Sequence, residues 1–563
     1  MSVDGAVTDV TILGMPVPSG APRSHGRRFS GAVAAALLMG FPLAAQAPPS
    51  WEELEVRQAR IAAVDLRLGD VFDLSQPQEN HWIGRMANAL HIQTREQVVR
   101  RELLFGPGDV VNARLIHESE RNLRAFRFLK DAWIEPRTDG SGAVRAVVHT
   151  QDAWTLKGSV GFTQVGGQRD FGFSLHEGNL LGFGKDLSLA HERTPERSID
   201  TVRYLDRQLL GSAWILESRY QSLSDGKTRF LEVAKPYRGL DTPWSMTFRA
   251  SASDATQSVY NLERVAYAFP SRQAGALVEG SMAMDPVDGR VVRLGGGLDL
   301  RQSRYGPVRT LDPAGLPVPR LRDRLLWGAH ASWNLFEERF RTFRDLAGMT
   351  HSEDFNLGWE ATVNLGSHLK RLGSDVDSPF LLVHASKGWT SGASSLLLFR
   401  GRAEGRHESG GWQDAFLNLS LTAYHQGFHA QTQAAYMRVD AVLRPEPENH
   451  LYLGGFEGLR GYGNHLLLGD RRWLASLEER INTSYDWLGI LRLGFVVYAD
   501  AGGIRRADTG AWSRTYVDVG GGLRFGNLKS ATGRVFLLTV AYPLVRDPGT
   551  EHHQFIITDV VTF

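Results

Sequence analysis

Apolar and polar residues alternate through most of the chain, from residue 154 to its end. In LRLGFVVYAD (491–500) every second residue is apolar, while the positions between them include Arg492 and Asp500. The stretch VDVGGGLRF (517–525) repeats this pattern. A period of two is the period of a β-strand with two different faces. Residues 154–563 are therefore expected to form a mainly β domain.

The turns and the last strand favour a transmembrane antiparallel β-barrel over a soluble β protein, although both folds alternate with the same period. Short turns such as YDWLG (485–489) alternate with long polar connections such as residues 303–323. The chain ends on FIITDVVTF (555–563), which closes with an aromatic residue. One face of this last strand is a candidate C-terminal assembly signal: Phe555, Ile557, Val561 and Phe563. Asp559 lies on that same face and interrupts it.

The number of barrel strands is expected to be about 16. Dividing the β region by about 26 residues per strand and loop gives this even number, as bacterial barrels require. A direct count of alternating segments gives about 20, and the surplus is assigned to loop hairpins within residues 255–350.

A small α+β domain is expected in front of the barrel, at residues 56–151. TREQVVRRELLF (94–105) opens with a capping-box spacing at Thr94, and residues 112–126 place apolar side chains on one helical face. Strands are expected at 59–66, 131–137 and 143–150.

The first 47 residues have the features of a secretory signal peptide. Two arginines precede FSGAVAAALLMGFPLAAQA (29–47), a short apolar run with an A-x-A ending. The cleavage site is expected near Ala45 or Ala47. The run is short for a membrane anchor, so a folded domain beyond the inner membrane is the favoured interpretation.

Composition and missing motifs exclude several functions. The 63 basic and 62 acidic residues leave a net charge of +1, which gives no field for binding nucleic acid. There are no cysteines, so no disulfide or thiolate metal site can form. Nucleophile-elbow, zinc-protease and Walker motifs are absent. We therefore expect no enzyme activity, no cofactor and no metal.

The front domain resembles the polypeptide-transport-associated (POTRA) domain. The matching residues are Gly108-Asp109, SERNLRAFRFLKDAWI (119–134) and VVHTQDAWTL (147–156). This resemblance implies that the domain receives unfolded or secreted protein clients, with a free strand edge as the candidate site for β-augmentation.

The barrel resembles the BamA/TamA superfamily, the bacterial surface-antigen family. The most specific match is LYLGGFEGLRGYGNHLLLGDRRWLASLEER (451–480), whose Leu459-Arg460-Gly461-Tyr462 fits the family's (L/V)-R-G-(F/Y) loop. In that family the loop folds back into the barrel lumen. The resemblance implies that Arg460 pairs there with Glu478 and Asp500.

Counting strand faces supports these partners independently. Glu478 and Arg480 share a face with Arg472, whereas Trp473 and Leu477 lie on the other. Glu478, Arg480 and Asp500 are thus expected to face the lumen. A solvated loop charge is the alternative interpretation of Arg460.

The resemblance implies an outer-membrane protein that assists the insertion or translocation of other proteins. Its front domain would lie in the periplasm, and its partners would be outer-membrane lipid, clients and an accessory periplasmic protein or lipoprotein. A passive outer-membrane channel is the first alternative. A two-partner secretion-type transporter is the second, although such transporters usually carry two POTRA domains.

Overall fold

The computed structural model describes residues 49–77, 80–138, 143–313, 315–349, 352–428, 430–487, 491–528, 535–547 and 550–559. The predicted signal peptide with its cleavage site lies outside these residues. So do Val561 and Phe563 of the C-terminal assembly signal.

A small α+β domain precedes the barrel. Its elements are α1 (Trp51–Val56), β1 (Ile61–Gly69), α2 (Trp82–Leu90), α3 (Glu96–Arg100), α4 (Ala113–Arg124), β2 (Leu129–Thr138) and β3 (Val144–Asp152). The sheet order is β1-β3-β2, with β3 parallel to β1 and antiparallel to β2. Ile116 and Leu123 of α4 are fully buried in one core with Ile61 and Val148 of the sheet. The apolar face predicted for 112–126 therefore covers the sheet.

The starts of the two central helices differ in how they are capped. Asn112 caps α4, because its side chain accepts the backbone N–H of Leu115. The capping box predicted at Thr94 is wrong: α3 follows Arg95, which makes no side-chain cap. Thr94 instead donates its backbone N–H and its hydroxyl to the buried carboxylate of Asp152. Thr94 thus binds a residue distant in sequence, Asp152, instead of capping the helix.

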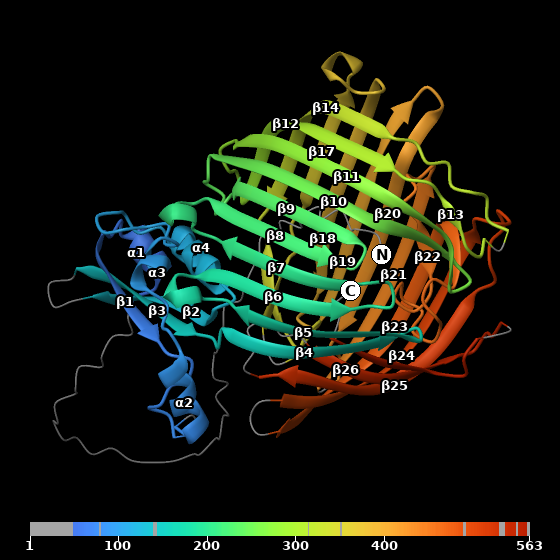
Figure 1. The fold of residues 1–563 in the computed structure, drawn as a ribbon. Helices are drawn as coiled ribbons and strands as arrows, with labels where there is room; N and C mark the ends of the chain where they lie inside the picture. The colour runs from blue at the N-terminus through green and yellow to red at the C-terminus, as the bar shows by residue number, and fades with distance from the viewer. Residues whose placement is uncertain are drawn as a thin grey trace, which may run out of the picture.

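The remaining strands close into an antiparallel barrel (Figure 1). Its wall consists of β4 (Leu156–Val165), β5 (Gln168–Glu177), β6 (Lys185–Arg193), β7 (Ser198–Asp206), β8 (Ile215–Leu223), β9 (Gly226–Lys235), β10 (Trp244–Asn261), β11 (Arg264–Ala283), β12 (Arg290–Tyr305), β14 (Arg324–Glu337), β17 (Glu360–His368), β18 (Ser378–Ser391), β19 (Ser395–Glu408), β20 (Gly411–His425), β21 (Gln431–Leu443), β23 (Leu467–Trp487), β24 (Leu491–Arg506), β25 (Tyr516–Asn527), β26 (Val535–Pro543) and β27 (Gln554–Asp559). The short β13 (Arg309–Thr310) and β22 (Leu451–Leu453) pair along this wall. Short 3₁₀ turns lie at η1 (Leu180–Gly182), η2 (Leu209–Gly211) and η3 (Lys370–Leu372).

The predicted number of about 16 strands is wrong, because the barrel has 20 among the described residues. The estimate used too long a repeat. Strands β4 to β9 have only 9 or 10 residues each, and several are joined by tight turns such as Gly166-Gly167. The direct count of alternating segments was the better guide.

One hairpin that begins within 255–350 and ends beyond it does stand apart from the wall. Strands β15 (Phe340–Arg344) and β16 (Ser352–Asn356) form their own two-stranded sheet between β14 and β17. The segments before it do not: β10, β11 and β12 are wall strands of 18, 20 and 16 residues.

The outside of the barrel is apolar and the inside is polar. On β20, Leu417, Leu419 and Leu421 are exposed on the outer face, while Asn418 and Ser420 alternate with them. On β19 the inward positions carry charges: Arg400, Arg402, Glu404, Arg406 and Glu408. An apolar outer surface with a charged interior is the pattern of a barrel that spans a membrane. Among the described residues, no helix is both long and apolar enough to cross a bilayer.

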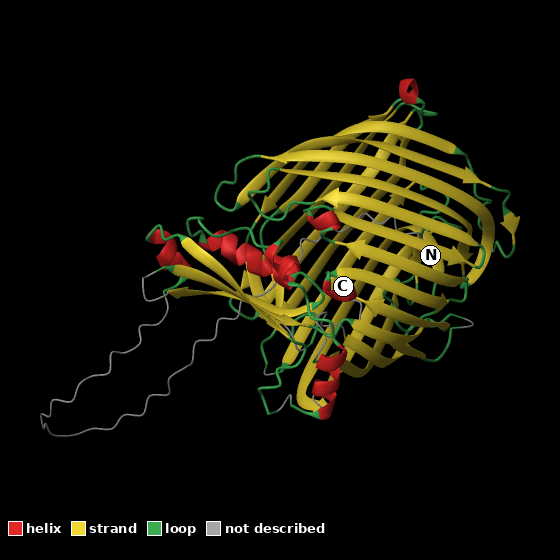
Figure 2. Cartoon of the chain, turned by 60° about the vertical axis from the view of Figure 1, so that its left-hand side comes forward, coloured by secondary structure: helices red, strands yellow, loops and turns green. Residues whose placement is uncertain are grey.

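The α+β domain lies against one end of the barrel, called the domain end below; the opposite end is the far end (Figure 2). Two buried side chains in turns between barrel strands attach the domain to the barrel. Asn179 Nδ2 donates to Thr94 Oγ1 over 2.9 Å, and Gln208 Nε2 donates to the carbonyl of Val98 over 2.9 Å. Along α4, Arg121 forms an ion pair with Glu338, at the root of the β15–β16 hairpin. The domain therefore contacts both the wall and the hairpin.

Candidate functional site in the barrel lumen

The glycine-rich loop 454–465 enters the lumen from the far end. Its backbone closes on itself, since Leu459 N–H donates to Gly454 and Tyr462 N–H donates to Leu459. Gly461 lies so close to the wall that an added Cβ would come within 2.6 Å of the Asp518 side chain. Only glycine allows the backbone to approach the wall this closely.

Arg460 projects from this loop into a buried acidic site. Its Nε and Nη2 donate to the two carboxylate oxygens of Asp500, each over 2.7 Å. Nη1 donates to Glu478 over 2.7 Å, and Nη2 also donates to Ser476 over 3.0 Å. The guanidinium carbon lies 3.4 Å from the ring centroid of Tyr498. A planar, multidentate donor meets all these groups at once, which a lysine ammonium could not do.

The residues on either side of Arg460 hold the loop against the wall. Leu459 and Tyr462 are fully buried, in an apolar cluster with Leu474 and Tyr516. The Tyr462 hydroxyl lies 2.8 Å from the carbonyl oxygen of Val517. All four residues of the sequence-predicted loop motif thus lie inside the barrel, and the predicted contacts of Arg460 with Glu478 and Asp500 are present.

The same loop also contacts the first hairpin of the barrel. Asn464 Nδ2 donates to the carbonyl of Val165 over 2.8 Å, and its backbone N–H donates to Gly166 over 3.3 Å. Gly166 has a φ of +57°, and an added Cβ would collide with the Asn464 side chain. The loop therefore binds the turn between β4 and β5 through Asn464.

This contact lies beside the seam where β4, the first barrel strand, meets β27, the last. Strand β4 pairs with β5 along all ten of its residues. Among the described residues, β4 and β27 pair at a single position, Gln164 with Ile557. Within the described part of β27 (Gln554–Asp559), the seam between the first and last strands has this one paired position, and Asn464 attaches the loop to its β4 side.

The β15–β16 hairpin enters the lumen from the domain end. Its connection buries apolar side chains against inward-facing residues of the wall: Phe343, Leu346 and Ala347 pack with Leu396, Tyr424 and Ala434. Leu346 and Met349 are fully buried. Two segments, one from each end, therefore occupy the lumen.

Arg480 joins these two segments. It donates through Nε to Glu478 over 2.8 Å, on the carboxylate that also binds Arg460. Its Nη1 lies 3.2 Å from the carbonyl of Leu346 and 3.3 Å from that of Ala347. A continuous chain of charged hydrogen bonds thus runs from the far-end loop to the domain-end hairpin.

Several members of the site were not predicted as partners of Arg460. Strand parity places Ser476 on the face of Glu478 and Tyr498 on the face of Asp500, although neither was expected to contact Arg460. Asp518 is fully buried beside Asp500 on the next strand, and neither of its carboxylate oxygens has a hydrogen-bond partner among the described residues. Within the part of the chain that the structure describes, no cluster of three or more His, Cys, Asp or Glu residues could hold a metal ion.

The predicted C-terminal signal is described only in part. Phe555 is half exposed on the outer face of β27, and Ile557 lies on the same face. The inward neighbour Ile556 is buried.

The strand edge proposed for clients is partly covered. The outer backbone groups of β2 already bind side chains: Ile134 N–H donates to Glu120, Trp51 Nε1 donates to the carbonyl of Ile134, and Arg124 donates to the carbonyl of Ala132. An added strand would have to exchange these bonds for its own.

Comparison with known proteins finds similarity in structure only. No family model and no curated protein matches the chain. The solved structure of BamA from Haemophilus ducreyi lacking POTRA domains 1–3 is similar at 15% identity and a TM-score of 0.39, covering 82% of this chain and 81% of that one. CdiB from Acinetobacter baumannii is similar at 12% identity and a TM-score of 0.43, covering 89% and 74%. CdiB from Escherichia coli is similar at 14% identity and a TM-score of 0.46, covering 89% and 77%.

The chain's own geometry carries the features that the sequence resemblance implies. It has a closed barrel, an α+β domain in front of β4, and a loop arginine held by lumen carboxylates. These features agree with the fold and the lumen pairing that the sequence resemblance implies.

Proposed function

We propose that the protein inserts or translocates other proteins at the bacterial outer membrane, without covalent catalysis. The observation that carries the proposal is the contact of Asn464, on the lumen loop, with the β4–β5 turn beside the β4–β27 seam, where the described residues of β27 pair with β4 at one position. Unpaired backbone groups are costly in lipid, so an opened seam would favour pairing with a client's strands.

The occupied lumen argues against a passive channel. The loop and the hairpin enter from opposite ends and are linked through Arg480. A channel built for steady flow would keep its polar interior open to water. The α+β domain, placed in the periplasm under this proposal, lies where clients would arrive.

Depletion of the protein followed by quantitative outer-membrane proteomics tests this function. If it inserts barrels, the levels of several barrel proteins should fall together. If it transports one secreted partner, a single surface protein should fall while barrel proteins stay constant. Unchanged levels of both classes would contradict the proposal.

A variant of Asn464 tests the contact between the lumen loop and the β4–β5 turn directly. Asn464→Ala removes the side-chain hydrogen bond to the β4–β5 turn and should change client levels. Its control is Asn449→Ala, in the same long connection, where the side chain bonds only to Asp414 among the described residues. Equal client levels in the two variants would show that the contact of Asn464 with the turn is not needed for function.

A further inference from the structure

Helix α2 of the front domain carries an apolar face that the protein leaves exposed. Trp82, Met86 and Leu90 follow one another at four-residue spacing and are 66%, 49% and 68% exposed. On the opposite side of the helix, Asn88 Nδ2 donates to the carbonyl of Phe72 over 2.8 Å, and Asn88 Oδ1 accepts the Phe72 N–H over 3.0 Å. A surface helix usually buries its apolar side, so an exposed one marks a contact with something outside the chain.

The C-terminal end of α2 is attached beside the first barrel strands. His91, the residue after the helix, has its Nε2 2.7 Å from Asp152 Oδ2, and Asp152 ends β3 just before β4. Arg95 donates its backbone N–H to the carbonyl of Gly182 over 3.0 Å and its Nε to that of Leu181 over 3.2 Å. Both carbonyls belong to the η1 turn between β5 and β6. Helix α2 therefore lies at the domain end of the wall, apart from the other helices of the domain (Figure 1).

The exposed apolar surface continues from α2 onto the outside of the barrel. Ile92 is half exposed and adjoins η1, because a Cβ added to Gly182 would lie 3.5 Å from Ile92 Cγ2. Leu181 in that turn is also half exposed. On the outer face of the wall, Leu156 at the start of β4 and Leu175 near the end of β5 extend this surface. The apolar face of α2 is thus an extension of the barrel surface that faces lipid.

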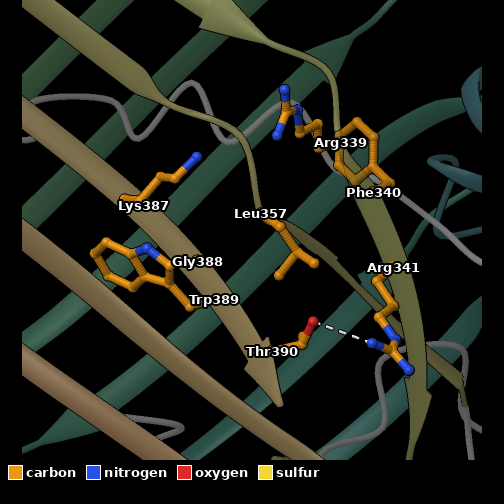
Figure 3. A pocket seen from close by; sticks show the side chains of 8 residues that line it. All are labelled: Arg339, Phe340, Arg341, Leu357, Lys387, Gly388, Trp389 and Thr390. Atoms are coloured by element: carbon orange, nitrogen blue, oxygen red, sulfur yellow. Dashed lines mark hydrogen bonds between the residues drawn. The ribbon is translucent and has the colours of Figure 1, made fainter. Parts of the chain in front are cut away.

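Exposed tryptophans place the domain end of the wall at the level of lipid headgroups. Trp244 begins β10 and Trp389 lies near the end of β18, both exposed on the outer face. Figure 3 shows that Trp389 points away from Arg341 and Thr390, whose hydrogen bond of 3.0 Å lies on the lumen side of β18. Aromatic girdles of this kind mark the boundary between hydrocarbon and water in barrels. Helix α2, attached at this same end, therefore lies beside the headgroup layer.

The charge of this segment also suits a lipid surface. Residues 80–95 contain two arginines, Arg85 and Arg95, and no aspartate or glutamate. Arg85 is exposed on α2, next to the apolar face. Helices with an apolar face that includes tryptophan, and with cations beside it, bind in the interface of membranes that contain anionic lipid. A lipid surface thus matches both the apolar and the charged side chains of α2.

We propose that α2 lies in the headgroup layer of the leaflet on the domain side, with Trp82, Met86 and Leu90 among the upper acyl carbons. Arg85 then lies among the phosphate groups. Because the end of α2 is attached beside β4, this contact holds the front domain against the membrane next to the seam between β4 and β27. The proposal goes beyond the proposed function: it requires a barrel that spans a membrane, but not that the protein inserts or translocates clients.

Spin labels on the full-length protein test this position. The chain has no cysteine, so each variant carries one labelled site. In nanodiscs of phosphatidylglycerol and phosphatidylethanolamine, a label at Met86→Cys should collide readily with oxygen and should lose contact with a water-soluble nickel chelate. A label at Val56→Cys, at the exposed end of α1 in the same domain, should stay accessible to the chelate.

A second pair of variants separates insertion from folding. Ala89 is exposed on the same side of α2, so a label at Ala89→Cys should behave like the one at Met86→Cys. Adding Met86→Asp/Leu90→Asp should return the Ala89→Cys label to water, because carboxylates are costly among acyl chains. Adding Val56→Asp instead should leave that label in lipid. Heat-modifiable gel mobility confirms that each barrel has folded.

Three results would overturn the proposal. A Met86→Cys label that meets the nickel chelate as readily as the Val56→Cys label would place α2 in water. Magnetic coupling between Met86→Cys labels, in nanodiscs that hold two copies of the chain, would assign the apolar face to a second copy. Protection from both oxygen and chelate that appears only when a peptide of a barrel strand is added would assign the face to a protein ligand.

Discussion

The two segments inside the barrel are held by opposite kinds of interaction. The far-end loop is fixed mainly by charge, through one arginine and two carboxylates, with leucine and tyrosine beside it. The domain-end hairpin is fixed mainly by apolar packing, and wall side chains such as Arg480 and Gln426 donate to its backbone carbonyls.

The difference bears on which segment can leave the lumen. If the whole loop withdraws, water can replace Arg460 around the carboxylates, so the charged contacts are exchanged rather than lost. If the hairpin withdraws, its leucine and phenylalanine side chains must enter water, with nothing to offset the cost. Withdrawal of the loop would also expose Leu459 and Tyr462, but its charged contacts can be exchanged for water. We therefore expect the loop to be the more movable of the two segments.

Reversing the charge of Arg460 should have the largest effect. Breaking a buried ion pair from one side costs about 3–5 kcal/mol, because the remaining charges stay buried without a partner. Arg460→Asp should therefore abolish client assembly and lower the temperature at which the folded form loses its gel mobility.

A compensating change sharpens this test. Arg460→Asp/Asp500→Arg restores one attractive pair and should recover part of the activity. Arg264→Asp, at an exposed ion pair on β11, should change little. Full activity in Arg460→Asp would indicate that Arg460 is a solvated loop charge.

Leu346→Ala tests the apolar segment. A buried leucine truncated to alanine loses about 2–3 kcal/mol, at the lower end of the usual range, where the surroundings can relax. The hairpin should then leave the lumen more often, and planar-bilayer recordings should show more frequent large openings. Leu372→Ala, on the partly exposed η3 turn, is the control. Identical traces for the two variants would contradict a fixed hairpin.

Arg480→Gln should have a smaller effect, of about 1–2 kcal/mol, because Glu478 keeps Arg460 as its partner. This variant also tests whether Arg480 couples the loop to the hairpin. If Arg480 links the two segments, the effects of Arg460→Ala and Leu346→Ala on thermal stability should be non-additive in the native chain. They should become additive in the Arg480→Gln background. Additive effects in both backgrounds would mean that the segments act independently.

The smallest expected effect concerns the domain that supports the hairpin. His117 on α4 lies 3.2 Å from both Glu120 and Glu52, and these carboxylates raise the pKa of His117. The folded state therefore binds the proton more tightly. This stabilisation is complete below the ordinary histidine pKa of about 6.5 and is lost as pH rises through the raised value. Hydrogen exchange of α1 should accelerate over that range, and His117→Gln should remove the dependence. His407→Gln, on β19, should leave it intact. A pH-independent native α1 would contradict this link.

Strand parity explains why the lumen partners could be predicted. Side chains alternate strictly along a strand, so fixing one inward residue near Arg472 fixes Glu478 and Arg480 as well. The same rule places Ser476 on this face. Which loop residue reaches these carboxylates was implied only by the family resemblance.

Other features depend on contacts that no local pattern contains. Thr94 has the spacing of a helix cap but binds Asp152, 58 residues away in sequence. The alternation of 340–356 is that of any hairpin and does not reveal that it turns inward. The strand total went wrong because an average repeat length was applied to short and long strands alike.

The bond between Asn464 and Val165 joins residues 299 positions apart in sequence. A chain that emerges from its N-terminus must keep the first hairpin incomplete until the loop, and then β27, have been delivered. Contacts of such high sequence separation slow folding and prolong exposure of unpaired strand edges. During its own folding we therefore expect this barrel to close slowly, with the edge of β4 exposed until the loop and β27 arrive.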